Sequence, residues 1–392
     1  WGYRYASMGV EGVVEAALVY AAAAAVLGVA VGGLAALTAG GGPLDALIAS
    51  LYLGLMGFHP IMVSLLTALR PVRAQLVTLT SRLSFAILVT LLVYLLSLRS
   101  SWAVLALALA SIGLATGLAM AYLARYTGAG LGKGLSLAAE WARGAWVPLL
   151  MGGSTFLSGL DALLVAMLYG SEAVAAYYAV TLPATITVEL AGTAFGHLHA
   201  YVVGGGGVEQ VVASATLVAL ALAPILATLI AWSDALVSLV NPVYTPHHHA
   251  LAVASLAAVA SIALTPVSST VMGLDRSMAG RPGPVLRRVA IASPILSASY
   301  LALVLALSRV LDPVTGWVYA RLASTLAALA LYIYVGGPEA KTVAARVGVR
   351  VSCYTAALTA LALLAPRPVL QPRFWLQVVE VLESMTWMLP GY

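Results

Sequence analysis

Charged residues are scarce in this sequence, and it has a single cysteine, Cys353. Asp, Glu, Lys and Arg make up 8% of the 392 residues, and hydrophobic residues make up 62%. A soluble domain carries about 25% charged residues, so a water-soluble fold of this size could not cover so much apolar surface. One cysteine also excludes an internal disulfide. The composition therefore predicts that lipid surrounds most of the chain.

Local enzyme motifs are missing as well. The sequence has no Walker-type phosphate loop, no CxxC and no HExxH, and no GK[ST] follows the GGGG at 204–207. The run His247–His249 offers ligands from one loop only, whereas a metal site usually needs several elements; a solvated loop is the favoured interpretation. The net charge of +5 comes from basic residues spread over many short loops. We therefore predict no enzymatic activity, no cofactor, no metal site and no nucleic-acid partner.

Apolar runs of about 20 residues, the length that crosses a bilayer, fill the chain. They cover 12–38, 45–69, 76–98, 102–124, 145–169, 173–202, 210–232, 250–274, 289–308, 314–336 and 349–366. A further segment, 374–389, contains Glu380 and Glu383 and is either a short span or a helix in the interface, the latter being favoured. The predicted fold class is all-α, a polytopic membrane protein of two helical bundles with 11–12 transmembrane helices.

One connection is longer and less apolar than the others. It is YTGAGLGKGLSLAAEWARG at 126–144, and we interpret it as a linker with a short surface helix. The predicted domains are a first bundle of four spans at 1–125, this linker, a second bundle of six spans at 145–336, and additional C-terminal helices within 337–392.

Basic residues predict the orientation. If the N-terminus lies inside and the spans alternate, thirteen Lys and Arg residues fall inside and four outside. Cytoplasmic loops are enriched in these residues. We therefore expect a multi-pass protein of the cytoplasmic membrane, with the N-terminus of this chain and the linker in the cytoplasm and His247–His249 outside.

Four charged residues lie deep within apolar runs: Arg82, Asp161, Glu189 and Arg321. Such residues are costly in lipid and usually face a bundle interior or a water-filled cavity, so a functional role is favoured over an ion pair that only fixes packing. Asp161 shares one helical face with Ser154 and Ser158, at spacings of three and four. We expect this face to line a cavity; the alternative is that Asp161 bonds an adjacent helix and locks the packing.

Four stretches carry a resemblance to a known family. S-x-x-D-x-L-L-V and then G-S-E-A-V-A-A-Y-Y-A, at 158–179, resemble the first span of the second lobe in polysaccharide flippases; here Ala176 replaces the usual Gly. DALVSLVNPVYTPHHHAL at 234–251, with GLDRSMAG at 273–280, is similar to an outer loop and the next inner turn. GYRYASMG at 2–9 resembles an inner loop of the first lobe. The chain thus resembles the multidrug/oligosaccharidyl-lipid/polysaccharide (MOP) superfamily, which includes the MATE drug exporters.

This resemblance implies a MATE-like architecture of two six-helix lobes, so we expect the first two transmembrane helices to precede Trp1. It implies a transporter that flips polyprenyl-linked oligosaccharide by alternating access, with the polyprenyl (pyro)phosphate-linked glycan, membrane lipid and H⁺ or Na⁺ as partners. Arg82 and Arg321 would contact the phosphate. Asp161 and Glu189 would couple the ion, line the cavity or hold those arginines in place.

Other functions stay open. A cation-coupled multidrug exporter of the MATE type is the first alternative, although an Arg in each lobe favours the flippase. A polytopic glycosyltransferase is more distant, because the first outer loop, AGGGPLD, has only one acidic residue. A permease subunit that needs a separate ATPase is not excluded by the sequence.

Overall fold

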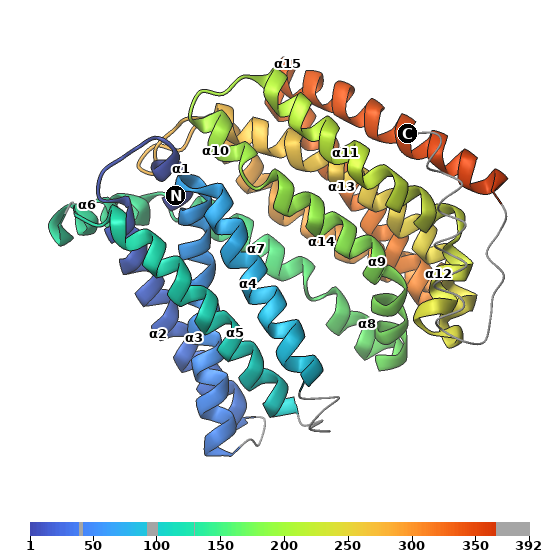
Figure 1. Cartoon of the computed structure of the whole chain (residues 1–392), viewed down its shortest axis with the longest axis horizontal. Coiled ribbons are helices and arrows are strands. Elements are labelled where there is room, and N and C mark those ends of the chain that lie inside the picture. Colours follow the sequence, from blue (N-terminus) through green and yellow to red (C-terminus); the bar gives the residue numbers. More distant parts are fainter. Residues whose placement is uncertain (39–41, 92–100, 129, 366–392) are drawn as a thin grey trace. The chain divides into compact units, whose positions relative to one another are not determined.

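The structure is a computed structural model that describes residues 1–38, 42–91, 101–128 and 130–365. Within these ranges it contains helices and no strand (Figure 1). Nine of the described helical segments are long and apolar enough to cross a membrane. The predicted fold class, an all-α polytopic membrane protein, is confirmed.

Within the described residues the predicted runs fall on helices, but three of the runs are not separate candidate spans. The run 76–98 corresponds to α4 (Pro71–Thr90) as far as the structure describes it, and α4 within the described residues is not among the nine. The runs 314–336 and 349–366 share α15 (Pro313–Leu364), which bends at Gly337, where φ is 65°; glycine adopts this conformation at little cost. The segment 374–389 lies outside the described residues.

The chain forms two compact units. Among the described residues, unit 1 comprises those within 1–145 and 277–281, and unit 2 comprises 146–276 and 282–365. The stretch predicted as a linker contains α6 (Leu131–Arg143), which packs against α2 within unit 1. The helical residues after 337 belong to unit 2. The cytoplasmic position of the linker stays a prediction.

Unit 1 contains α1 (Gly2–Ser7), α2 (Val13–Thr38), α3 (Pro43–Leu69), α4, α5 (Ser101–Leu123), the 3-10 turn η2 (Ala124–Tyr126) and α6. Helices α2 and α3 run side by side in close contact (Figure 1). A Cβ at Gly28 would lie 2.3 Å from the carbonyl oxygen of Leu53, and one at Gly32 would lie 2.4 Å from that of Ala49. Small residues let two membrane helices approach this closely.

Tyr5 joins three segments of unit 1. Its side chain is 1% exposed. The hydroxyl donates to Oε1 of Glu140 on α6 at 2.6 Å and accepts from the backbone N–H of Ala279 at 2.8 Å. Segment 277–281 is thereby tied to α1 and α6, which explains why it belongs to unit 1.

Unit 2 is built around α13 (His248–Leu274), the most buried of the candidate spans. The other helices are α7 (Trp146–Ser158), α8 (Asp161–Tyr169), α9 (Ser171–Phe195), α10 (Leu198–Val203), α11 (Val208–Ala231), α12 (Ser233–Val240), η3 (Pro242–His247), α14 (Pro284–Val310) and α15. Helix α13 packs against α9, α11 and α15, and α14 packs against α7 and α15. Helices α9 and α15, which carry Glu189 and Arg321, therefore pack against the same central helix.

Candidate functional site

Asp161 stands at a break in a membrane-spanning segment. The predicted run 145–169 is interrupted at Gly159 and Leu160, so α7 ends at Ser158 and α8 begins at Asp161. Oδ1 of Asp161 accepts a hydrogen bond from the backbone N–H of Ala162 at 2.7 Å. A carboxylate is favourable at a helix N-terminus, where backbone N–H groups lack partners within the helix.

The other carboxylate oxygen accepts two bonds from distant helices. Oδ2 of Asp161 accepts from the hydroxyl of Tyr300 on α14 at 2.5 Å and from Nε1 of Trp317 on α15 at 2.9 Å. Asp161 is 8% exposed. A carboxylate only accepts hydrogen bonds, and all three neighbours donate, which explains how an acid is accommodated in so apolar a segment.

An aromatic stack leads from Trp317 to Arg321. The rings of Trp317 and Tyr177 have centroids 3.6 Å apart and planes inclined by 10°, and Tyr178 meets Trp317 edge-on. The Tyr177 hydroxyl accepts a hydrogen bond from Nη1 of Arg321 at 3.3 Å. Trp317 and Arg321 are four residues apart and so lie on one face of α15.

Asp161, Tyr177, Tyr178 and Tyr300 line a cavity of about 390 Å³ in unit 2. We call it the Asp161 cavity. Arg321 and the hydroxyl residues Ser158, Ser324 and Thr325 also line it. Among the described residues, Arg321 makes no ion pair within 4.0 Å. The cavity thus combines a guanidinium, aromatic side chains and hydroxyl groups.

A second cavity of about 160 Å³ lies between α9, α13 and α15. We call it the Glu189 cavity. Its walls are mostly small and hydroxylated residues, and Glu189, Tyr177 and Arg321 also line it. Tyr177 and Arg321 therefore belong to the walls of both cavities. The structure brings Asp161 and Arg321 to one cavity and Glu189 and Arg321 to the other.

Arg82 is the fourth residue that the sequence singles out. It lies on α4 in unit 1, and its side chain is exposed. It is not among the residues that line the two cavities of unit 2. Its contact with a phosphate stays a prediction.

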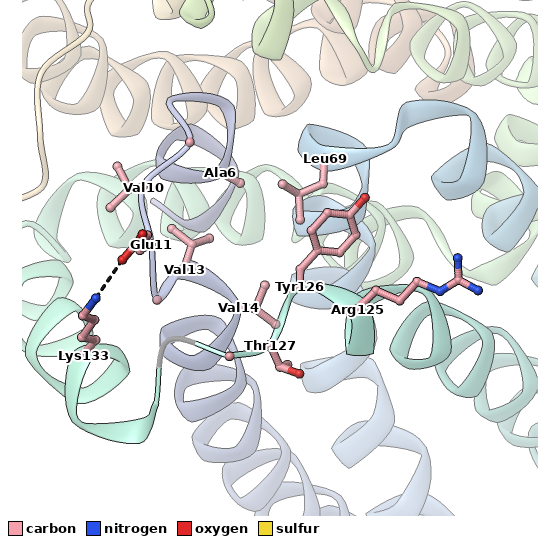
Figure 2. A pocket seen from close by; sticks show the side chains of 13 residues that line it. Ala6, Val10, Glu11, Val13, Val14, Leu69, Arg125, Tyr126, Thr127 and Lys133 are labelled. Carbon is pink, nitrogen blue, oxygen red and sulfur yellow. Dashed lines mark hydrogen bonds and ion pairs between the residues drawn. The ribbon is translucent and has the colours of Figure 1, made fainter.

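Unit 1 has a cavity of its own, about 500 Å³ in volume, near the first residues of α2 (Figure 2). Glu11 and Lys133 both line it and form an ion pair, with Nζ 2.7 Å from Oε2. The lysine lowers the pKa of Glu11 and the carboxylate raises that of Lys133. The side chain of Arg125 extends away from this pair (Figure 2). Because Lys133 already has an anionic partner, it is less available to an anionic ligand than Arg321 is.

The histidine run contributes to no metal site in the described part of the chain. No group of three or more His, Cys, Asp and Glu side chains in those ranges could hold an ion. Nδ1 of His247 lies 3.4 Å from Oδ1 of Asp312, and the ring of His248 lies against that of His249.

The sequence does not single out the three aromatic residues that link Asp161 to Arg321. Tyr177 occurs in one of the motifs of the resemblance, and Tyr300 and Trp317 lie in apolar runs where aromatic side chains are common. One general rule could have pointed to these residues. A Tyr or Trp in a membrane core needs a partner for its O–H or N–H, and Asp161 is a candidate acceptor. The sequence does not say which aromatic residue reaches it.

Comparisons of the chain with protein-family models, curated proteins and solved structures found no match. The chemistry of the two cavities is therefore the basis for assigning a function.

Proposed function

We propose that this protein is a transporter of the cytoplasmic membrane that flips a polyprenyl-linked oligosaccharide by alternating access. The observation that carries the proposal is Arg321, which lines the Asp161 cavity on a membrane-spanning helix and makes no ion pair among the described residues. A guanidinium pairs with phosphate through two parallel hydrogen bonds. The attraction is stronger in a low-dielectric site than in water.

The rest of the cavity suits the same ligand. The hydroxyls of Ser158, Ser324 and Thr325 are donors and acceptors that match the hydroxyl groups of a sugar. Tyr178 is 54% exposed and presents an aromatic surface to the cavity. The cavity therefore offers a guanidinium to an anionic group, and hydroxyl and aromatic groups to a sugar joined to that group.

An exporter of cationic drugs is supported less well. Such a substrate needs an acid that is available to it, and the two oxygens of Asp161 already accept three hydrogen bonds. Glu189 lines the narrower cavity, and we propose it as the residue that couples transport to protons or sodium. Arg82 stays a predicted phosphate contact.

Binding of the lipid-linked glycan tests the proposal. We expect Arg321→Ala to weaken binding of a polyprenyl diphosphate-linked sugar to the purified protein by about tenfold or more, the effect of losing a hydrogen bond to a charged group. Arg321→Lys should keep part of the affinity, because Lys retains the point charge. Arg309→Ala is the matched control, since Arg309 is exposed at the end of α14 and outside both cavities. Equal affinities for the wild type and Arg321→Ala would contradict the proposed site.

The proposed orientation has its own test. After Cys353, which is exposed, is replaced by Ser, single cysteines at Ser136 of α6 and at Val243 of η3 can be labelled in sealed vesicles. Both positions are exposed. We expect an impermeant reagent to label them from opposite sides, with Ser136 on the cytoplasmic side. Labelling of both from one side would refute the topology.

A further inference from the structure

We infer that Asp161 is a positioning residue for Arg321: it fixes Trp317, Trp317 places Tyr177, and Tyr177 holds the guanidinium at the cavity wall. The inference concerns how Arg321 is held in place. It rests on the proposed function only for the identity of the ligand that Arg321 binds. It gives Asp161 a role distinct from ion coupling.

The first step is a closed triangle of hydrogen bonds. Oδ2 of Asp161 accepts from Tyr300 at 2.5 Å and from Trp317 at 2.9 Å, and Nε1 of Trp317 lies 2.9 Å from the Tyr300 hydroxyl as well. Trp317 is fully buried, and Tyr300 is 6% exposed. The indole is thus fixed at its N–H as well as by packing, since a buried donor that loses its acceptor is costly.

The second step runs through the ring faces. Tyr177 is 2% exposed and lies flat against Trp317, with centroids 3.6 Å apart. A shift of the indole therefore shifts the tyrosine ring. The hydroxyl of that ring is the acceptor for Nη1 of Arg321, so the position of the guanidinium follows from that of the indole.

A cation-binding role for Asp161 fits these contacts poorly. A cation at Oδ2 would meet the indole N–H, which only donates hydrogen bonds and cannot serve as a ligand. The Tyr300 hydroxyl also points its hydrogen at this oxygen. An ion would have to displace both groups, and the triangle would be lost.

Chemical labelling of Arg321 tests the inference without any substrate. Phenylglyoxal modifies guanidinium groups, and peptide mass spectrometry reports the rate at each arginine. We expect Asp161→Ala to raise the labelling rate of Arg321 by between about twofold and about tenfold, the range for losing one hydrogen bond. Asp161→Asn should restore a rate near that of the wild type, because its amide oxygen still accepts from Trp317 and Tyr300. Arg309 serves as the internal reference in each sample.

Two further variants keep the test decisive. Trp317→Phe keeps an aromatic ring but removes the indole donor, so it should also raise the Arg321 rate, and it decides the matter if Asp161→Ala does not fold. Ser297→Ala removes the hydrogen bond between Ser158 and Ser297, 2.9 Å long, which joins α7 to α14 near the triangle. It should lower stability and leave the Arg321 rate unchanged. The inference is overturned if Asp161→Ala and Trp317→Phe label Arg321 no faster than Ser297→Ala does.

Ion dependence separates positioning from coupling. In reconstituted vesicles we expect Asp161→Asn to keep the dependence of transport on proton and sodium gradients. Loss of that dependence, with Arg321 labelling unchanged, would make Asp161 a coupling residue instead. Labelling needs no transport, so it can succeed or fail independently of the proposed flippase activity.

Discussion

The indole N–H of Trp317 donates to Oδ2 of Asp161 at 2.9 Å, although 156 residues separate them in the sequence. This bond helps to explain how an acid is accommodated in the apolar segment FLSGLDALLV at 156–165. The carboxylate is satisfied by donors from α8, α14 and α15. Two of these donors, Tyr300 and Trp317, are aromatic residues, and Trp317 stacks on Tyr177, which accepts a hydrogen bond from Arg321. Asp161 and Arg321 are therefore linked through these side chains.

The glycines of α2 set the distance between α2 and α3. Gly28→Ala or Gly32→Ala would place a methyl group within 2.4 Å of a backbone carbonyl oxygen of α3, and backbone cannot move aside easily. We expect each change to lower the free energy of unfolding by about 1–3 kcal/mol, as overpacking typically does. Thermal unfolding in detergent measures this.

Gly117→Ala is the matched control for the glycine series. Gly117 lies within α5, and a Cβ there would meet no atom within 4 Å. The change should be neutral or slightly stabilising, because Ala favours a helix more than Gly does. If Gly28→Ala and Gly32→Ala behave like Gly117→Ala, the close packing of α2 on α3 is wrong.

Tyr5 should contribute to the stability of unit 1 through its hydroxyl. Tyr5→Phe removes both hydrogen bonds and leaves the buried N–H of Ala279 without its acceptor. We expect a loss of about 1–3 kcal/mol in the free energy of unfolding, whereas Tyr334→Phe, at a residue that is 80% exposed, should have no effect. A Tyr5→Phe protein as stable as the wild type would show that segment 277–281 is held by other contacts.

The Glu11–Lys133 pair predicts a dependence on pH. Lys133 lowers the pKa of Glu11 in the folded protein, below the value of about 4.3 for a free Glu side chain. The stabilising contribution is therefore present above that value and is lost as the pH falls through the folded pKa. The unfolding midpoint of the wild type should approach that of Glu11→Gln as the pH drops from about 5 to about 3. The difference should also shrink at high salt, and a difference independent of both pH and salt would exclude the ion pair as its cause.

The sequence predicts the helices well because each apolar run is a local feature. It predicts the breaks less well. The interruption at Gly159 and Leu160 has no distinct local signal, because Gly152 and Gly153 of the same run lie inside α7. The long α15 joins two predicted spans because GGP at 336–338 bends the helix instead of ending it. The hydrogen-bond partners of Asp161 cannot be predicted from the local sequence, because they lie on α14 and α15, far away in the chain. Arg321 and Asp161 could be named from their cost in lipid, but the sequence does not say that Tyr177 and Trp317 lie between them.

The most direct test of the central claim is a flipping assay in vesicles that contain the purified protein and a fluorescent polyprenyl diphosphate-linked sugar. An impermeant quencher reports how fast the lipid leaves the inner leaflet. We predict that the wild type and Arg309→Ala accelerate this movement over protein-free vesicles, and that Arg321→Ala does not. A wild-type protein that leaves the lipid in place while exporting a cationic dye, or an Arg321→Ala protein that flips the lipid as fast as the wild type, would contradict the account.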